Sequence, residues 1–123
     1  MTISKKAFFQ VGTSEVSLNL ESTGFLGYTG MQHRLSLPED DGVLFEFDVA
    51  DDHGFWMNNV KIPLDIIFLD MSHRVVHIHA HAKPMSIEPI YSRKPVICVL
   101  EANGGWCAKN GITVGTQVHF DIR

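Results

Sequence analysis

The sequence has little that would suggest a membrane protein or a secretion signal. No run approaches the roughly 18 apolar residues that a membrane-spanning helix needs, so we expect no span. Lys5 and Lys6 are followed by only three apolar residues before Gln10, too few for the apolar region of a signal peptide. We therefore expect a cytoplasmic protein, or a periplasmic or otherwise exported one whose signal peptide has been removed.

Cysteine and positive charge are also scarce. Cys98 and Cys107 are the only cysteines, and two cysteines do not make a disulfide framework. Cys98 lies in the apolar run PVICVLE, which is typical of a small core residue. The formal net charge is −4. Because nucleic-acid binding depends on neutralising phosphates, this balance argues against a nucleic-acid partner.

Several motifs of catalysis and ligand binding are absent from the sequence. There is no G-x-S-x-G nucleophile motif and no glycine-rich phosphate loop. Half of the acidic residues fall between Glu39 and Asp52, but their spacing does not match the alternating carboxylates of a calcium loop. This segment is therefore interpreted as a solvated acidic edge.

Short segments with strand patterns fill most of the chain. Residues 15–21 alternate apolar and polar side chains, and residues 64–69 form a continuous apolar run whose two faces should both be covered. Turn residues separate these segments about every ten positions, which predicts an all-β single domain over residues 1–123, a compact sandwich or barrel of antiparallel strands. The predicted strands cover residues 15–21, 42–47, 64–69, 74–82, 95–101 and 116–122.

One or two short helices complete the prediction. One would follow the possible N-cap pair Ser22 and Thr23 and run toward Arg34, although three glycines weaken it. The other is a single turn over residues 106–110, with Gly111 as its C-cap. Residues 70–73 predict a short hairpin connection between two strands.

An aspartate stands inside the most hydrophobic predicted strand. Strand alternation places Asp65 on one face with Ile67 and Leu69. A buried carboxylate needs a partner, because an unpaired buried charge is costly. We predict a charge-assisted pair with Arg34, and the Asn59 amide is the other candidate partner.

The segment GFWMNNVKIP precedes this strand and allows two interpretations. In the structural one, Trp56 and Met57 belong to the core and Asn59 holds a turn. In the functional one, the flat ring and single N–H donor of Trp56 form a platform in a pocket that also carries polar groups.

Six segments occur in an order that resembles the DUF192 family of conserved proteins. They are GMQHR, GVLF, FWMNNVKIPLDIIF, KPMS, VLE and VGT, and the resemblance covers residues 16–120 approximately. It implies a mostly β single domain of a kind found in bacteria and archaea, often exported, with no established activity. The sequence has Val60 and Thr116 where the family pattern has threonine and aspartate. The matching polar and aromatic positions are Arg34, Trp56, Asn59, Asp65 and Glu101.

The segment HIHAH is the second unusual feature. Alternation places His77, His79 and His81 on one strand face, in steps of about 7 Å. Imidazoles at this spacing could converge on a divalent metal such as zinc, nickel or copper. The alternative is a solvent face that is rich in histidine, and the family pattern does not require these residues.

Three functions remain open, with no prediction of the oligomeric state. We favour a binding module for a small polar ligand such as a carbohydrate, in which Trp56 stacks on the ligand and Arg34, Asn59, Asp65 and Glu101 supply hydrogen bonds. The second is a hydrolase with Asp65 and Glu101 as an acid–base pair, which requires both carboxyl groups to face one cavity within about 5–9.5 Å. The third is a structural or partner-binding domain without a small ligand.

Overall fold

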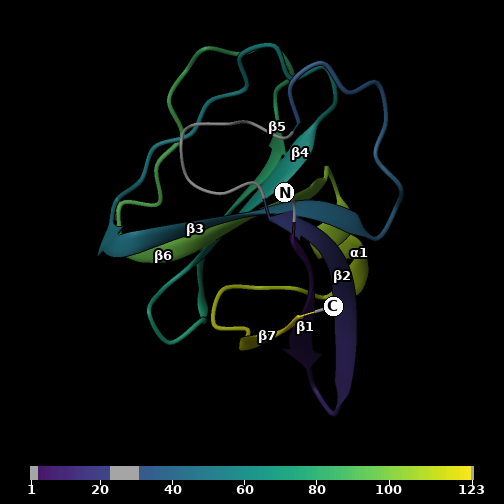
Figure 1. Ribbon diagram of the computed structural model, residues 1–123, viewed down its shortest axis with the longest axis vertical. Coiled ribbons are helices and arrows are strands. Elements are labelled where there is room, and N and C mark those ends of the chain that lie inside the picture. Colours follow the sequence, from purple (N-terminus) through teal and green to yellow (C-terminus); the bar gives the residue numbers. More distant parts are fainter. Residues whose placement is uncertain (1–2, 23–30, 123) are drawn as a thin grey trace.

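The computed structural model describes residues 3–22 and 31–122. Within these residues, seven strands form one sheet in the order β5-β4-β6-β3-β2-β1-β7, with a single short helix (Figure 1). All neighbouring strands are antiparallel except β2 and β3, which are parallel. The all-β prediction is confirmed. The elements are β1 (Ile3–Val11), β2 (Ser14–Ser22), β3 (Asp41–Asp51), β4 (Leu64–Leu69), β5 (Val75–Ala82), β6 (Val96–Asn103), α1 (Trp106–Asn110) and β7 (Val118–Ile122).

The sheet folds over so that its central strands lie between two layers. Strands β1, β2 and β7 lie on one side of β3, β4 and β6, and the long loops lie on the other side (Figure 1). Hydrogen bonds of Val75 to Gly115 and Thr116 bring the two ends of the sheet together at one corner. At this corner Arg74 and Gln117 form an isolated β-bridge, but β5 and β7 are not paired as strands. The sheet is therefore not a closed barrel.

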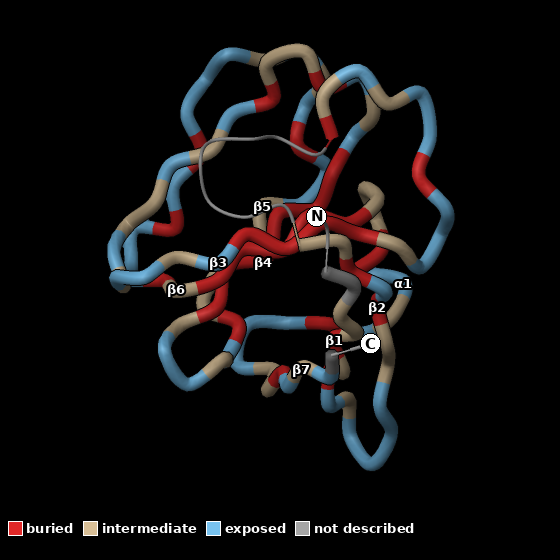
Figure 2. Tube along the Cα trace, viewed as in Figure 1, coloured by how far each residue is buried: buried red, intermediate tan, exposed pale blue. Residues whose placement is uncertain are grey.

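Strand β4 has a core on each of its faces. Ile67 and Leu69 face the inner core, which is enclosed by β1, β2, β6, β7 and α1. Leu64, Ile66 and Phe68 face the loop-side core, which lies between the sheet and the loops. Every residue of β4 is buried, which confirms both the predicted strand and its two covered faces (Figure 2).

The hairpin and the second predicted helix are confirmed, and the sequence analysis missed one strand. His73 donates its backbone N–H to the Asp70 carbonyl in the β4–β5 turn. Helix α1 ends at Gly111, which has a φ of 75°. Strand β1 escaped notice because its apolar signal is short and follows two lysines. The predicted helix after Ser22 falls largely on residues 23–30, outside the described residues, and residues 31–33 form a turn.

Two loop segments run antiparallel over the loop-side core and are called here the loop ribbon, residues 54–61 and 83–94. Phe55 and Ile90 exchange two backbone hydrogen bonds of 2.9 and 2.7 Å, and Met85 donates to the Val60 carbonyl. The side chains that point into the loop-side core are those of Phe55, Met57, Val60 and Ile90. Among the described residues, no helix has the length and apolar character to cross a membrane.

Candidate functional site

Asp65 is fully buried, and its partners are backbone N–H groups. One carboxyl oxygen, Oδ1, accepts hydrogen bonds from the backbone N–H groups of His81 and Gly105, both at 3.0 Å. The other, Oδ2, accepts from the backbone N–H of Cys107 at 2.9 Å. Asp65 therefore joins β4 to β5 and to the start of α1. The predicted pair with Arg34 is wrong, because these N–H donors satisfy the carboxyl group from the inner-core side.

Arg34 pairs instead with Glu21 near the surface. Its Nη2 lies 2.7 Å from Glu21 Oε2, and the two side chains are 34% and 43% exposed. An ion pair with this exposure contributes about 1 kcal/mol or less. Arg34 therefore belongs to the loop side of the sheet, and Asp65 to the opposite side.

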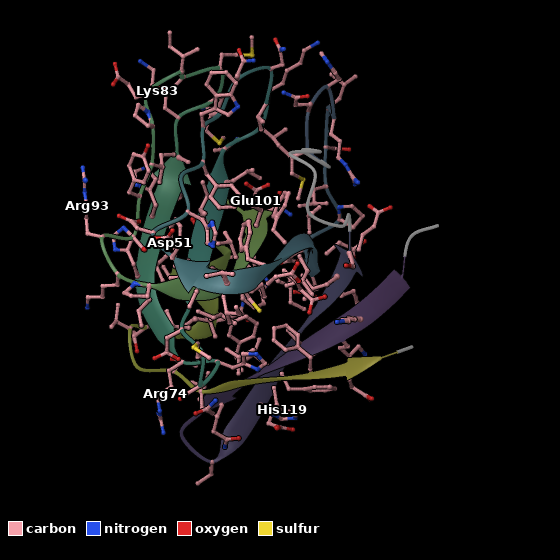
Figure 3. All side chains as sticks on the ribbon, turned by 60° about the vertical axis from the view of Figure 1, so that its left-hand side comes forward. Asp51, Arg74, Lys83, Arg93, Glu101 and His119 are labelled. Atoms are coloured by element: carbon pink, nitrogen blue, oxygen red, sulfur yellow. The ribbon has the colours of Figure 1, made fainter. Side chains whose placement is uncertain are left out.

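Glu101 is the second buried carboxyl group, and its surroundings are apolar. Its side chain is 4% exposed, and it has no hydrogen-bond partner among the described residues. Its cross-strand neighbours, Val43 and Ile66, belong to the loop-side core. Burial raises the pKa of Glu101 to about 8, because the apolar surroundings disfavour the charged form. The labelled side chain lies in the interior of the molecule in Figure 3.

The two buried carboxyl groups do not face one cavity. Asp65 pairs in register with Ala102, the neighbour of Glu101, and Ile66 pairs with Glu101 itself. Because successive side chains of a strand point to opposite faces, Asp65 faces the inner core and Glu101 faces the loop-side core. The geometry that the hydrolase hypothesis requires of this pair is absent.

Trp56 lies on the outer side of the loop ribbon and lines a shallow pocket. The pocket has a volume of about 350 Å³. Gly54 lets the Tyr91 ring approach the backbone closely, since a Cβ at position 54 would be 2.6 Å from Tyr91 Cε1. The Arg93 guanidinium lies 5.2 Å from the centre of the Tyr91 ring. The lining residues are Gly54, Phe55, Trp56, Pro89 and Tyr91.

Asn59 holds a turn, as the structural interpretation proposed. Its φ is 60°, a left-handed conformation that asparagine tolerates better than most residues, and its carbonyl accepts the His33 N–H at 3.0 Å. Asn59 is not among the residues that line the pocket beside Trp56. Of the five predicted ligand-binding residues, the pocket therefore contains only Trp56.

The family model of DUF192, described as Uncharacterized ACR, COG1430, matches residues 7–120. The chain belongs to the DUF192 family. The match begins earlier than the resemblance seen in the sequence, because residues 7–11 of β1 and the first part of β2 are included in it. Among curated proteins, none matches this chain.

Two solved structures are similar to this DUF192 protein along most of its length. A protein from Sinorhizobium meliloti 1021, described as a "putative transcription regulator", is 28% identical with a TM-score of 0.90, over 95% of this chain and 93% of the other. A protein of unknown function from Novosphingobium aromaticivorans DSM 12444 is 32% identical with a TM-score of 0.88, over 93% of this chain and 83% of the other. These similarities support the fold and the family and assign no activity.

The histidines of β5 do not form the regular row that alternation predicts. His77 and His79 pair with Phe68 and Ile66 on the loop side, but the register shifts after His79. His81 has a φ of 50°, and its ring lies beside Gly105 at the start of α1. A β-bulge therefore separates His81 from the other two. Within the described residues, no three His, Cys, Asp or Glu side chains are grouped to hold a metal ion. Metal binding by these histidines stays a prediction.

Both cysteines are free and buried. Burial, followed by the charge of Glu46, raises the pKa of Cys98 to about 11. Burial also raises the pKa of Cys107 strongly, and Asp65 raises it further. Both groups are therefore thiols at neutral pH, which does not favour a nucleophilic role.

The sequence analysis missed Tyr91 and Pro89 as pocket residues. They lie in a stretch without a clear strand pattern, more than 30 positions after Trp56. The pairing of Phe55 with Ile90 brings the two stretches together. The available signal was composition, because PIYSRK offers an aromatic ring beside a proline and cations, but no periodicity links this stretch to residue 56.

Proposed function

We propose that this DUF192 protein is a binding module for a small polar ligand, with carbohydrate as the class that fits best, and that the ligand binds between Trp56 and Tyr91. The observation that carries the proposal is the exposure of these two aromatic residues, 48% and 39%, at one shallow pocket. A volume of about 350 Å³ is at the lower end of the range for ligand sites and suits one or two sugar rings.

The chemistry of the two rings supports a ligand with both apolar and polar faces. Each ring offers a flat surface on which the C–H face of a sugar can pack. Within the described part of the chain, the Nε1–H of Trp56 and the hydroxyl of Tyr91 have no hydrogen-bond partner. Both groups are therefore available to the hydroxyl groups of a ligand.

A panel of neutral mono- and disaccharides tests the proposal by saturation-transfer NMR, followed by calorimetry on those that bind. Trp56→Ala and Tyr91→Ala should each weaken binding about tenfold or more, since each removes a stacking surface. Val114→Ala is the matched control, because Val114 is an exposed apolar residue outside this pocket. Failure of every saccharide to bind, or equal binding by Trp56→Ala and the unaltered protein, would refute the proposal.

A further inference from the structure

The loop ribbon presents large apolar side chains to solvent. Its inward residues are covered, but its other apolar side chains are left exposed by the backbone pairing. Single exposed apolar residues are ordinary, whereas several on one ribbon mark an interaction site. The exposed fractions are 48% for Trp56, 52% for Met85, 68% for Ile87 and 39% for Tyr91.

Cations flank these apolar side chains at both ends of the ribbon. Lys61 and Lys83 lie at the end where Met85 is hydrogen-bonded to Val60. Arg93 and Lys94 lie at the other end, beyond Tyr91, and Lys83 and Arg93 both project outward in Figure 3.

The charge of the ribbon contrasts with that of the whole protein. Glu88 is the only acidic residue of the ribbon, so its four cations leave a net charge of +3. The whole chain has a formal net charge of −4. At the Arg93 end this charge is offset in part, because Asp52 accepts hydrogen bonds from the Ser92 hydroxyl and the Arg93 backbone N–H. Positive charge is thus concentrated at the Lys61 and Lys83 end of the ribbon, beside the exposed Met85.

We propose that the loop ribbon docks on the surface of a membrane that contains anionic lipids. Ile87, Met85 and Trp56 would enter the interface between headgroups and acyl chains, where aromatic and apolar side chains are stabilised. Lysine and arginine side chains beside them would contact lipid phosphates. The acidic remainder of the protein is repelled by such a membrane, so the charge distribution also orients the protein.

Docking goes beyond the proposed function and does not require a ligand in the pocket. Ile87 and Met85 do not line that pocket, so the two roles can be separated by substitution. An acidic protein surface would also attract the cations. The exposed apolar residues on a narrow ribbon, with two cations at the Lys61 and Lys83 end, favour a lipid interface over a broad protein interface.

Co-sedimentation with vesicles tests the proposal on the full chain. Vesicles of phosphatidylcholine alone are compared with vesicles that also contain phosphatidylglycerol. We expect binding to the anionic vesicles, weakened by salt, with a blue shift of the tryptophan emission. The shift reports Trp56, because Trp106, the only other tryptophan, is 2% exposed. Equal binding to the neutral and the anionic vesicles would overturn the proposal, and so would no binding to either. In the second case an acidic protein is the alternative partner.

Matched substitutions identify the surface. Ile87→Asp should lower vesicle binding about tenfold, and Lys83→Glu about fivefold or more. Val114→Asp is the control for the first, because Val114 is 60% exposed and lies outside the ribbon. Equal losses for Ile87→Asp and Val114→Asp, with unchanged melting temperatures, would overturn the proposal. Saccharide binding should be unchanged in Ile87→Asp and weakened about tenfold or more in Tyr91→Ala, so failure of one proposal is distinguishable from failure of the other.

Discussion

Replacing Glu101 by glutamine should stabilise the protein, and increasingly so as the pH rises. The carboxyl group is buried against Val43 and Ile66 with no hydrogen-bond partner among the described residues. Burial raises its pKa from 4.5 to about 8. Between these two values the folded state keeps a proton that the unfolded state has lost. The free energy of unfolding of the natural protein therefore falls as the pH rises through this window.

The size of the effect follows from the two pKa values of Glu101. Each unit of difference corresponds to about 1.4 kcal/mol, so ionisation of Glu101 costs up to about 5 kcal/mol across the window. Above pH 8 both states are ionised and the dependence ends. Glutamine has nearly the same shape and does not ionise, so Glu101→Gln should lack this slope.

Urea unfolding at pH 5.5, 6.5, 7.5 and 8.5 measures the difference between Glu101→Gln and the natural protein. We expect the variant's advantage to grow by about 1 kcal/mol for each pH unit up to about pH 8. Comparing the two proteins removes contributions from the histidines, which both contain. Glu88→Gln is the control, because Glu88 is exposed. The free energy of unfolding of this variant should differ from that of the natural protein by the same amount at every pH. Parallel pH profiles for Glu101→Gln and the natural protein would show that Glu101 is not held neutral by burial.

Three further predictions concern Asp65, Gly54 and His79. Asp65→Asn should lower the free energy of unfolding, measured with urea, by about 2–5 kcal/mol. The amide keeps one oxygen, and its NH2 group cannot accept a hydrogen bond, so at least one of the three backbone N–H groups loses its acceptor. A loss below about 1 kcal/mol would contradict this. Gly54→Ala should displace the Tyr91 ring and weaken saccharide binding in calorimetry while leaving the melting temperature nearly unchanged. Zinc titration at pH 7.5 should give a weaker isotherm for His79→Ala than for the natural protein. Zinc affinity should also fall as the pH falls, because protons compete with the metal for the imidazole nitrogens. Identical weak isotherms for the two proteins would mean that the histidines form a solvent face and no metal site.

The sequence predicted the environment of Asp65 but not its partners. A continuous apolar run and simple alternation were enough to place β4 in the core with Asp65 on the same face as Ile67. The N–H donors come from His81, Gly105 and Cys107, which are 16 to 42 positions away. Every residue type except proline carries a backbone N–H, so no side-chain pattern identifies such a donor. The search for a partner among side chains therefore led to Arg34.

One extra residue in β5 explains why alternation did not predict the position of His81. Alternation holds from His77 to His79, and then two residues of β5 lie opposite Asp65. The bulge turns the His81 N–H toward the Asp65 carboxyl group, so the feature that breaks the row of histidines also satisfies the buried aspartate. Alternation describes regular strands, and a bulge is set by contacts made across the sheet.

Comparing Asp65 with Glu101 separates two influences on how a buried carboxyl group affects the stability of the protein: its burial and its hydrogen bonds. Both are at most 4% exposed, and they occupy adjacent register pairs of β4 and β6. Asp65 accepts three backbone N–H groups, whereas Glu101 accepts none among the described residues. If burial alone decided the outcome, replacing either carboxyl by its amide would stabilise the protein. Since hydrogen bonding offsets desolvation at Asp65 only, we expect opposite signs at pH 7.5: a loss for Asp65→Asn and a gain for Glu101→Gln.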